Sequence, residues 1–324
     1  MILPILLNIL LPILVMVGLG AWLRWKFQID LGTLTKLNIY LFVPAFVFDR
    51  VANSKLPWGD MGGVVMITLV QVTTLGIIVW GIGRALNVGR KSLCAVALAV
   101  MFYNSGNFGL PLAQLAYPGG GGHKDGGAVQ AFVVMVQNVL TFTLGLGIAA
   151  SAHSAGVAQV LVRILRLPVL YVLAAALGAR MWLDAAPERA LPTLIAKPVE
   201  YLSAGLVPVA LVTLGAQLAV RPRWPRWKPV GLVLFLRLLV GPAQMALLLW
   251  GFHLIGWRAL DLWPGPGELL ILTAAVPTAV NTLLLTLELD GDAALAADCV
   301  FWTTVFSCVT ITGWLVTLRV FMPT

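Results

Sequence analysis

About ten apolar runs of roughly 20 residues follow one another along this chain of 324 residues, and each is long enough to cross the hydrocarbon core of a bilayer as a helix. Charged residues make up only 10% of the sequence, whereas a typical soluble domain carries about 25%. The length alone would allow two soluble domains, but the apolar runs exclude them. We predict one all-α polytopic membrane protein.

The runs give a set of expected spans. We expect ten membrane-spanning helices, near residues 2–22, 32–49, 61–83, 93–117, 127–150, 167–186, 198–219, 230–255, 268–287 and 294–320. The first run has no basic residue before it and no small-residue cleavage site after it. We therefore expect a first span and not a removable signal peptide.

Lysine and arginine are unevenly distributed between the predicted loops. With the N-terminus outside, the inner loops and their flanks hold 12 of these residues and the outer positions hold 8. Basic residues favour the cytoplasmic side of a membrane. Because the number of spans is even, both termini are predicted on the outer side.

The basic character of the chain does not indicate a nucleic-acid partner. The net charge is +8, and the segment 221–229 interleaves basic and aromatic residues as single-stranded nucleic-acid sites do. This segment lies between two predicted spans, however, where tryptophan and basic residues anchor helix ends at the membrane interface. We expect the lipid bilayer as its partner and no nucleic acid.

No feature of the sequence indicates an enzyme, a metal site or a cofactor. Cys94, Cys299 and Cys308 lie in apolar runs without Cys-x-x-Cys spacing, so we interpret them as buried small apolar residues. No Gly-x-Ser-x-Gly turn is present. The glycine-rich segment 118–127 lacks the Gly-Lys-Ser/Thr of a phosphate loop.

The two halves of the chain carry matching proline segments. Leu3-Pro4-Ile5-Leu6 resembles 167–170, and Leu41-Phe42-Val43-Pro44 resembles 205–208, both at an offset of 164 residues. Pro111 and Pro277 match at an offset of 166. Five spans per half would give the two copies opposite orientations, as in many transporters. We predict inverted repeats at 1–155 (spans 1–5) and 156–324 (spans 6–10).

One span is unusually polar. The segment Asn104-Ser-Gly-Asn-Phe-Gly-Leu-Pro111 lies inside the fourth apolar run. A proline in a helix interior costs about 3 kcal/mol or more, so we expect a break near Gly106 to Pro111, matched by a break at Pro277. Broken backbone at membrane depth is tolerated only inside protein or beside a water-filled cavity. The two breaks should meet, and their half-helix N-termini form a ready site for an anion.

Polar and backbone-permissive residues around these breaks are the candidate substrate-binding residues. They are Asn104, Ser105, Gly106, Asn107, Gly109 and Pro111 in the first half, Pro277, Thr278 and Asn281 in the second, and Gln137 and Asn138 on the fifth span. Each could instead only satisfy broken backbone or join two helices.

Two ionisable residues within spans allow alternative interpretations. Asp298, near the start of the tenth span, is an ion-coupling candidate because charged groups at membrane depth are costly; the alternative is that it reaches the cytoplasmic interface. Arg237 in the eighth span either pairs with an acidic group, which is favoured, or lies along a boundary between helices.

The segments 104–112, 202–218 and 276–277 resemble the auxin efflux carrier family of membrane transporters, and the resemblance extends over nearly the whole chain. It implies ten spans with outside termini, a scaffold of spans 1, 2, 6 and 7, and a transport unit of spans 3–5 and 8–10. In that unit the broken helices 4 and 9 would cross at their prolines. Asn104 matches the asparagine that contacts the substrate carboxylate in the plant carriers.

The resemblance further implies a secondary transporter of a small organic anion, a mono- or dicarboxylate, that works by alternating access. The chain lacks the long hydrophilic loop of the plant carriers after the fifth span, and Val169 replaces a polar asparagine. A bacterial-type member in the inner (plasma) membrane is therefore expected. Proton or sodium coupling and a homodimer are left open.

The alternative is a sodium/proton antiporter or a bile-acid-type sodium symporter of similar architecture. An antiporter would place carboxylates at the crossing, and neither 101–114 nor 272–285 contains one. This absence counts against it.

Overall fold

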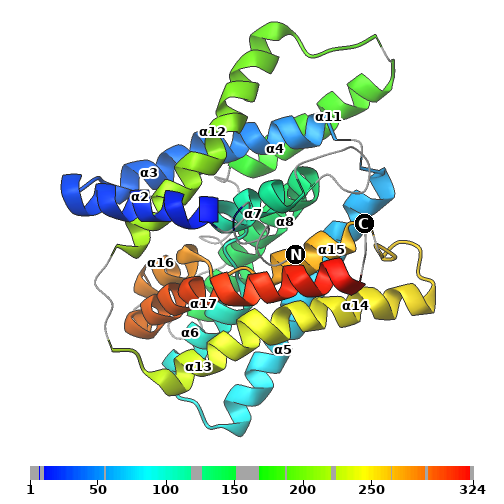
Figure 1. Cartoon of the computed structure of the whole chain (residues 1–324). Coiled ribbons are helices and arrows are strands. Elements are labelled where there is room, and N and C mark those ends of the chain that lie inside the picture. Colours follow the sequence, from blue (N-terminus) through cyan, green and yellow to red (C-terminus); the bar gives the residue numbers. More distant parts are fainter. Residues whose placement is uncertain are drawn as a thin grey trace.

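The computed structural model describes residues 7, 11–54, 56–117, 126–150, 168–186, 188–219, 224–263, 265–288 and 291–321. These residues form helices and their connections, and they contain no strand (Figure 1). Parts of the predicted first span, the segment 3–6 used for the repeat, most of the loop 118–127 and residues 221–223 lie outside the described residues.

The α-helices occupy most of the described chain. They are α2 (Leu11–Phe27), α3 (Leu31–Leu37), α4 (Val43–Ala52), α5 (Trp58–Ala85), α6 (Arg90–Met101), α7 (Leu110–Ala116), α8 (Gly126–Leu140), α9 (Leu146–Ala150), α11 (Pro168–Asp184), α12 (Thr193–Leu218), α13 (Trp227–Phe235), α14 (Gly241–Ile255), α15 (Gly267–Ala274), α16 (Val280–Glu288) and α17 (Ala293–Phe321). Short π-helical turns are η2 (Asn38–Phe42), η3 (Ser105–Gly109), η5 (Thr141–Gly145) and η6 (Leu236–Val240).

Six helical segments of the described chain are long and apolar enough to cross a membrane. They are Leu31–Ala52, Trp58–Ala85, Gly126–Ala149, Thr193–Leu218, Trp227–Ile255 and Ala293–Val320. The other four predicted spans coincide with α2 and α11, of 17 described residues each, and with two interrupted pairs, α6 with α7 and α15 with α16. The count of ten stays a prediction.

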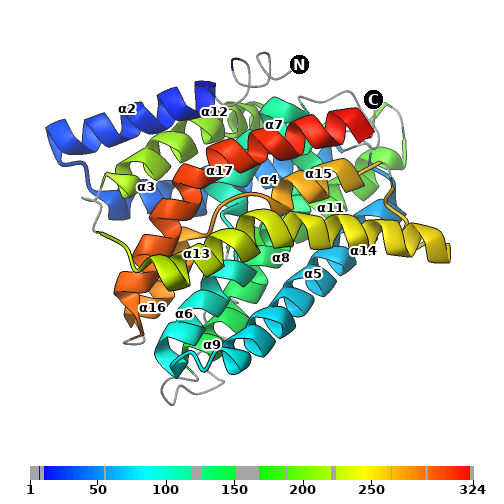
Figure 2. The ribbon, with the colours of Figure 1, turned by 60° about the horizontal axis from the view of Figure 1, so that its bottom comes forward.

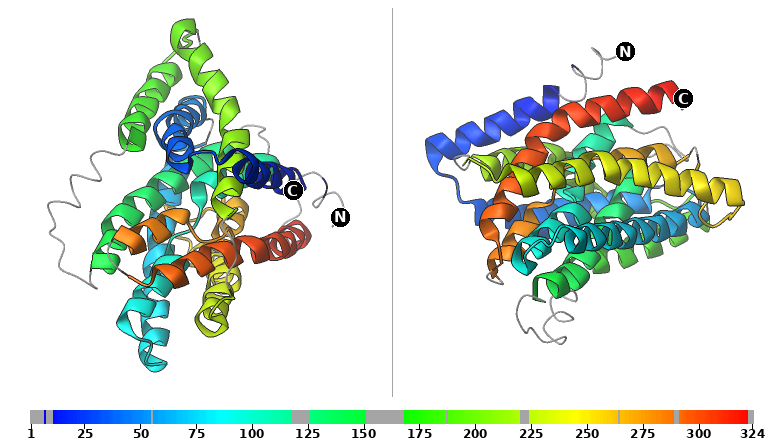
Figure 3. Two further views of the ribbon diagram at one scale, coloured as in Figure 1. Left: turned by 90° about the vertical axis from the view of Figure 1, so that its left-hand side faces the viewer. Right: turned by 90° about the horizontal axis from the view of Figure 1, so that it is seen from below.

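The helices pack in two groups. In one group, α12 packs against α2 and α4, and α11 packs against α4. The other group contains α5, α6, α13, α14 and α17, which are also in contact with one another. In Figure 1 the first group lies above and the second below, with α7 and α8 between them, and the left view of Figure 3 shows the same separation. One hydrophobic core joins the groups, with members such as Phe46 and Leu206 from the first group and Ile67 and Met245 from the second.

Two glycines allow α2 and α12 to approach closely. A Cβ at Gly20 would overlap the backbone carbonyl of Val212, and a Cβ at Gly215 would overlap that of Val17. Small residues at such a crossing let two backbones come together, which is how helices in membranes often associate. Gly18, also on α2, has no atom within 4 Å of its Cβ position.

Several prolines lie inside continuous helical segments. The turns η2, η3 and η6 end two residues before Pro44, Pro111 and Pro242. A proline lacks an N–H group and its ring clashes with the carbonyl four residues earlier; a π-turn shifts the bonding to five residues and makes room for the ring. At Pro242, the Leu238 carbonyl instead accepts from the indole Nε1–H of Trp314 at 3.1 Å. These helices therefore continue through their prolines.

Candidate functional site

Two helices are interrupted next to each other. The first is helical to Met101 and again from Ser105 to Ala116, so the non-helical segment is 102–104. The second is helical to Ala274 and again from Val280, so its non-helical segment is 275–279. In Figure 2, α6 and α16 lie on one side of this region and α15 on the other. The predicted break at Gly106 to Pro111 is wrong in position, because η3 accommodates Pro111 within the helix, whereas Pro277 does lie in the non-helical segment.

Backbone hydrogen bonds join the two non-helical segments. Tyr103 and Thr278 form an isolated antiparallel bridge, in which the Asn104 N–H donates to the Pro277 carbonyl at 2.8 Å and the Ala279 N–H donates to the Phe102 carbonyl at 3.0 Å. These bonds satisfy groups that a helix would otherwise pair internally. The two segments are thereby held in register in the interior of the protein.

Thr278 completes this backbone pairing and is fully buried. Its Oγ1–H donates to the Ala99 carbonyl at 2.8 Å, and its N–H donates to the hydroxyl of Thr303 at 3.1 Å. Ala99 lies in the last turn of α6, where helix carbonyls lack internal partners. The Thr278 side chain is thus engaged in supporting the helix end.

Asn104 stands at the start of the second half of the first interrupted helix. Its Oδ1 accepts from the Asn107 N–H at 3.1 Å, which caps η3 and fixes the orientation of the amide. The Nδ2 is buried and has no hydrogen-bond partner in the described part of the chain, and the residue is only 7% exposed. A buried donor without a partner costs about 1–3 kcal/mol. An acceptor supplied by a ligand would remove that cost.

Open space adjoins the capped helix start. A Cβ at Gly106 would meet no atom within 4 Å, and Gly106 and Asn107 are both half-buried. Gly109 has a different role, because its Cβ would lie 2.5 Å from Nε2 of Gln130. That amide donates to the Ser105 carbonyl at 2.8 Å. Gly109 therefore permits α8 to approach η3.

The other predicted site residues are distributed unequally. Ser105, which follows Asn104 directly, and Pro111, in α7, are buried, and Asn281 is half-buried near the start of α16. Gln137 and Asn138 lie on α8; Gln137 is 2% exposed, and its side chain interacts with the Tyr103 hydroxyl. Asp298 is half-buried in the first turns of α17, where its charge interacts with Arg226.

A cation lies on the other side of the bridge. Arg237, in η6, is fully buried and its guanidinium stacks 4.6 Å from the centroid of the Tyr103 ring. Its Nη1–H donates to the Val100 carbonyl at 2.8 Å, and its Nη2–H donates to the Ala274 carbonyl. Among the described residues no carboxylate forms an ion pair with it. The favoured prediction of an acidic partner is wrong because helix-end carbonyls take that place.

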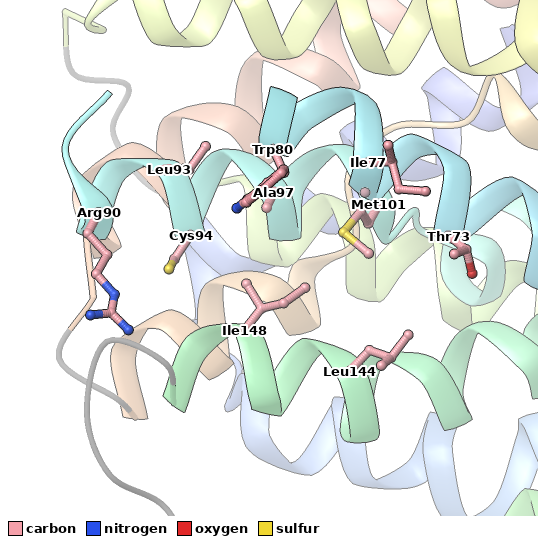
Figure 4. Close-up of a pocket in the computed structure, with 11 residues that line it drawn as sticks. Thr73, Ile77, Trp80, Arg90, Leu93, Cys94, Ala97, Met101, Leu144 and Ile148 are labelled. Carbon is pink, nitrogen blue, oxygen red and sulfur yellow. The ribbon is translucent and has the colours of Figure 1, made fainter. Parts of the chain in front are cut away.

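Around the site, the described residues contain no group of three His, Cys, Asp or Glu side chains placed to hold a metal ion. A separate cavity of about 500 Å³ lies beside α6 (Figure 4). Arg90 lies at one end of it and Thr73 at the other, with mainly apolar side chains between them. The cavity offers little polar chemistry, so the candidate site is the bridge region.

A charged cluster connects three helix starts on the side of the protein where Asp298 lies. Asp292 accepts hydrogen bonds from Arg226 Nη2 at 2.6 Å, Ser92 Oγ at 2.9 Å and the Leu295 N–H at 3.2 Å. Burial alone would raise the pKa of Asp292, but these hydrogen bonds outweigh it and lower the pKa below its ordinary value. Asp292 therefore stays ionised at neutral pH.

Comparison with known proteins identifies the class of protein to which the chain belongs. A family model described as "Membrane transport protein" matches residues 5–315. The chain belongs to this membrane transport protein family. Membership and the apolar helices identify it as an integral membrane protein and indicate a transporter rather than an enzyme.

Two relatives carry names of the same kind. One, from Methanothermobacter thermautotrophicus, is named "Uncharacterized transporter" and is 28% identical over 316 residues, covering 95% of this chain and 97% of the relative. Another, from Rhizobium meliloti, is named "Putative malonate transporter" and is 24% identical over 302 residues, covering 89% of this chain and 87% of the relative.

In this member of the membrane transport protein family, three residues of the site were absent from the candidate substrate-binding residues. Tyr103 supplies the bridge, Gln130 connects Ser105 to Thr273 by accepting from the Thr273 hydroxyl at 2.6 Å, and Arg237 binds two helix ends. Gln130 and Arg237 had one usable signal, because a strongly polar side chain inside an apolar run needs an interior partner. The sequence does not indicate which residue that partner is.

Proposed function

We propose that the chain is a secondary transporter that moves a small organic anion, a mono- or dicarboxylate, across the membrane by alternating access. The anion binds at the bridge between the two interrupted helices. The observation that carries this proposal is the Asn104 amide, whose oxygen caps η3 and whose buried NH2 group has no partner among the residues that the structure describes.

The chemistry of the site suits a carboxylate. An amide NH2 donates hydrogen bonds without adding a charge, so it can both bind and release an anion. The helical segments that follow the two interruptions begin at Ser105 and Val280, on either side of the bridge. Helix N-termini carry partial positive charge and unpaired N–H groups. Open space at Gly106 leaves room next to Asn104.

The architecture we propose has ten spans in two inverted repeats, 1–155 and 156–324. Spans 1, 2, 6 and 7 form the scaffold, and spans 3–5 and 8–10 form the transport unit. The separate packing of α2, α4, α11 and α12 supports this assignment. The backbone pairing of the interrupted helices also supports the assignment, because segments joined by hydrogen bonds would move together.

A dicarboxylate is favoured by the relative named "Putative malonate transporter". The test is uptake of labelled malonate, of other short mono- and dicarboxylates and of a cation such as choline into proteoliposomes, preceded by a thermal-shift panel on purified protein. We expect a carboxylate to raise the unfolding temperature and to be taken up. Stabilisation and uptake of the cation alone would contradict the proposal.

Asp298 is the proposed ion-coupling residue. Its charge interacts with Arg226, so binding of a coupling ion would compete with that interaction. We expect Asp298→Asn to lose gradient-driven accumulation while it keeps substrate binding. Unchanged accumulation with unchanged pH dependence would show that Asp298 only reaches the membrane interface.

The proposed location is a bacterial inner membrane with both termini outside. Trp224 is 89% exposed and precedes α13, in the segment expected to be cytoplasmic. A cysteine replacing Trp224 should resist membrane-impermeant labelling of intact cells. Efficient labelling would reverse the orientation.

A further inference from the structure

Arg237 binds the C-terminal ends of both interrupted helices at once. Val100 is the penultimate residue of α6 and Ala274 is the last residue of α15, and both carbonyls accept from the guanidinium. The side chain is fully buried. One cation therefore contacts two helix ends that come from opposite halves of the chain.

Four helix ends meet at the bridge, and their charges oppose one another. The C-terminal ends of α6 and α15 each carry a partial negative charge, while the N-terminal ends of η3 and α16 carry partial positive charges. Without a further charge these contributions would largely cancel. Arg237 lies at the negative ends and has no carboxylate partner among the described residues, so it leaves the region with net positive charge.

We propose that Arg237 sets the charge selectivity of the site by neutralising the two negative helix ends, so that the site favours an anion and favours a dianion over a monoanion of the same shape. This inference rests on the proposed function, in which the anion binds beside Asn104. Arg237 acts through the helix ends and not by touching the anion, because its guanidinium stacks on the Tyr103 ring and donates to the two helix-end carbonyls. It is a positioning residue.

The local structure is shaped to hold this guanidinium. Gly241 lies four residues after Arg237, and a Cβ there would be 3.3 Å from Nη2 and 3.4 Å from the Ala274 carbonyl oxygen. An alanine would therefore push the guanidinium or the carbonyl by a few tenths of an ångström. Arg237 lies within the π-turn η6, which directly precedes Gly241 and Pro242, and π-turns are frequent at functional sites.

The experiment compares one dicarboxylate with its monomethyl ester, which has nearly the same shape and one charge fewer. Malonate and its monoester are the first pair, and any other pair bound by the wild type serves equally. Dissociation constants are measured by calorimetry for the wild type, Arg237→Lys and Arg237→Gln. Because Coulomb energy is proportional to ligand charge, we expect Arg237→Gln to weaken dianion binding by about the square of the factor for the monoanion. Arg237→Lys should keep the wild-type preference.

A milder pair of variants covers the case in which Arg237→Gln does not fold. Gly241→Ala should reduce the dianion preference severalfold, whereas Gly251→Ala on the same helix, with no atom within 4 Å of its Cβ, should leave it unchanged. The inference is overturned if Arg237→Gln weakens binding of the dianion and the monoanion equally. If Arg237→Gln does not fold, an unchanged dianion preference in Gly241→Ala overturns it. If the wild type binds no carboxylate, the proposed function itself fails, so the two failures are distinguishable.

Discussion

The backbone N–H of Asn104 donates to the carbonyl of Pro277 at 2.8 Å, although the two residues lie in opposite halves of the chain. Together with the bond from Ala279 to Phe102, it pairs the backbone of both helix interruptions. Asn104 is therefore held by its backbone on one side and by its cap to Asn107 on the other. Its free NH2 group has a fixed position, as a binding group requires.

Two glycines in the polar segment should respond differently to alanine. In Gly109→Ala the new Cβ would lie 2.5 Å from Gln130 Nε2 and force that amide away from the Ser105 carbonyl. We expect a loss of about 1–3 kcal/mol of stability. Gly106→Ala adds a methyl group to open space, so its stability should be unchanged or slightly higher. Thermal unfolding of the two purified variants checks this, and equal unfolding temperatures would contradict it.

The crossing of α2 and α12 gives a second matched pair. Gly20→Ala would drive a Cβ into the Val212 backbone, which cannot rotate away as a flexible side chain can. A destabilisation of about 1–3 kcal/mol is expected. Gly18→Ala, on the same helix with open space around it, is the control and should be near neutral. Wild-type stability of Gly20→Ala in detergent would show that the two helices are not this close.

The fold could be predicted in part because it depends on periodic and compositional features. Apolar runs predict helices since backbone in a bilayer must bond internally, and Leu31–Ala52 and Ala293–Val320 lie close to expected spans. The polar segment starting at Asn104 could be located because it interrupts one of these apolar runs. Its role in binding stays a prediction.

The position of the first interruption could not be predicted from local signals. Pro111 is the strongest helix breaker in that segment by intrinsic preference, yet η3 accommodates it, and the helix is interrupted at 102–104 instead. What stabilises an interruption there is pairing with residues 277–279, and no local pattern encodes so distant a partner. For the same reason the sequence singles out Arg237 as an ionisable residue within a span but does not assign it to helix-end carbonyls.

The Asp292 cluster gives a prediction about pH. A carboxylate whose folded pKa lies below its unfolded value adds stability above the unfolded pKa and loses it as pH falls through the folded one. Because the pKa of Asp292 is lowered from 3.8, Asp292→Asn should cost about 1 kcal/mol, constant from about pH 5 to 8 and vanishing only at lower pH. Thermal unfolding at several pH values measures this.

Glu200→Gln is the control for that series, since its ion pair with Lys197 is exposed on both sides. It should leave stability nearly unchanged at every pH. A cost of Asp292→Asn that declined between pH 8 and 5 would mean that Asp292 titrates in that range and is not held ionised by Arg226 and Ser92.

The central claim is that the Asn104 amide binds the carboxylate of the substrate, and calorimetry on purified variants tests it most directly. Asn104→Ala should weaken binding by roughly 1.5–3 kcal/mol, the value of one hydrogen bond to a charged group. Asn104→Asp keeps an oxygen to cap Asn107 but replaces the NH2 group with negative charge, so it should fold and bind still more weakly. Wild-type affinity in both folded variants would show that the anion binds elsewhere and that Asn104 serves only to cap the helix.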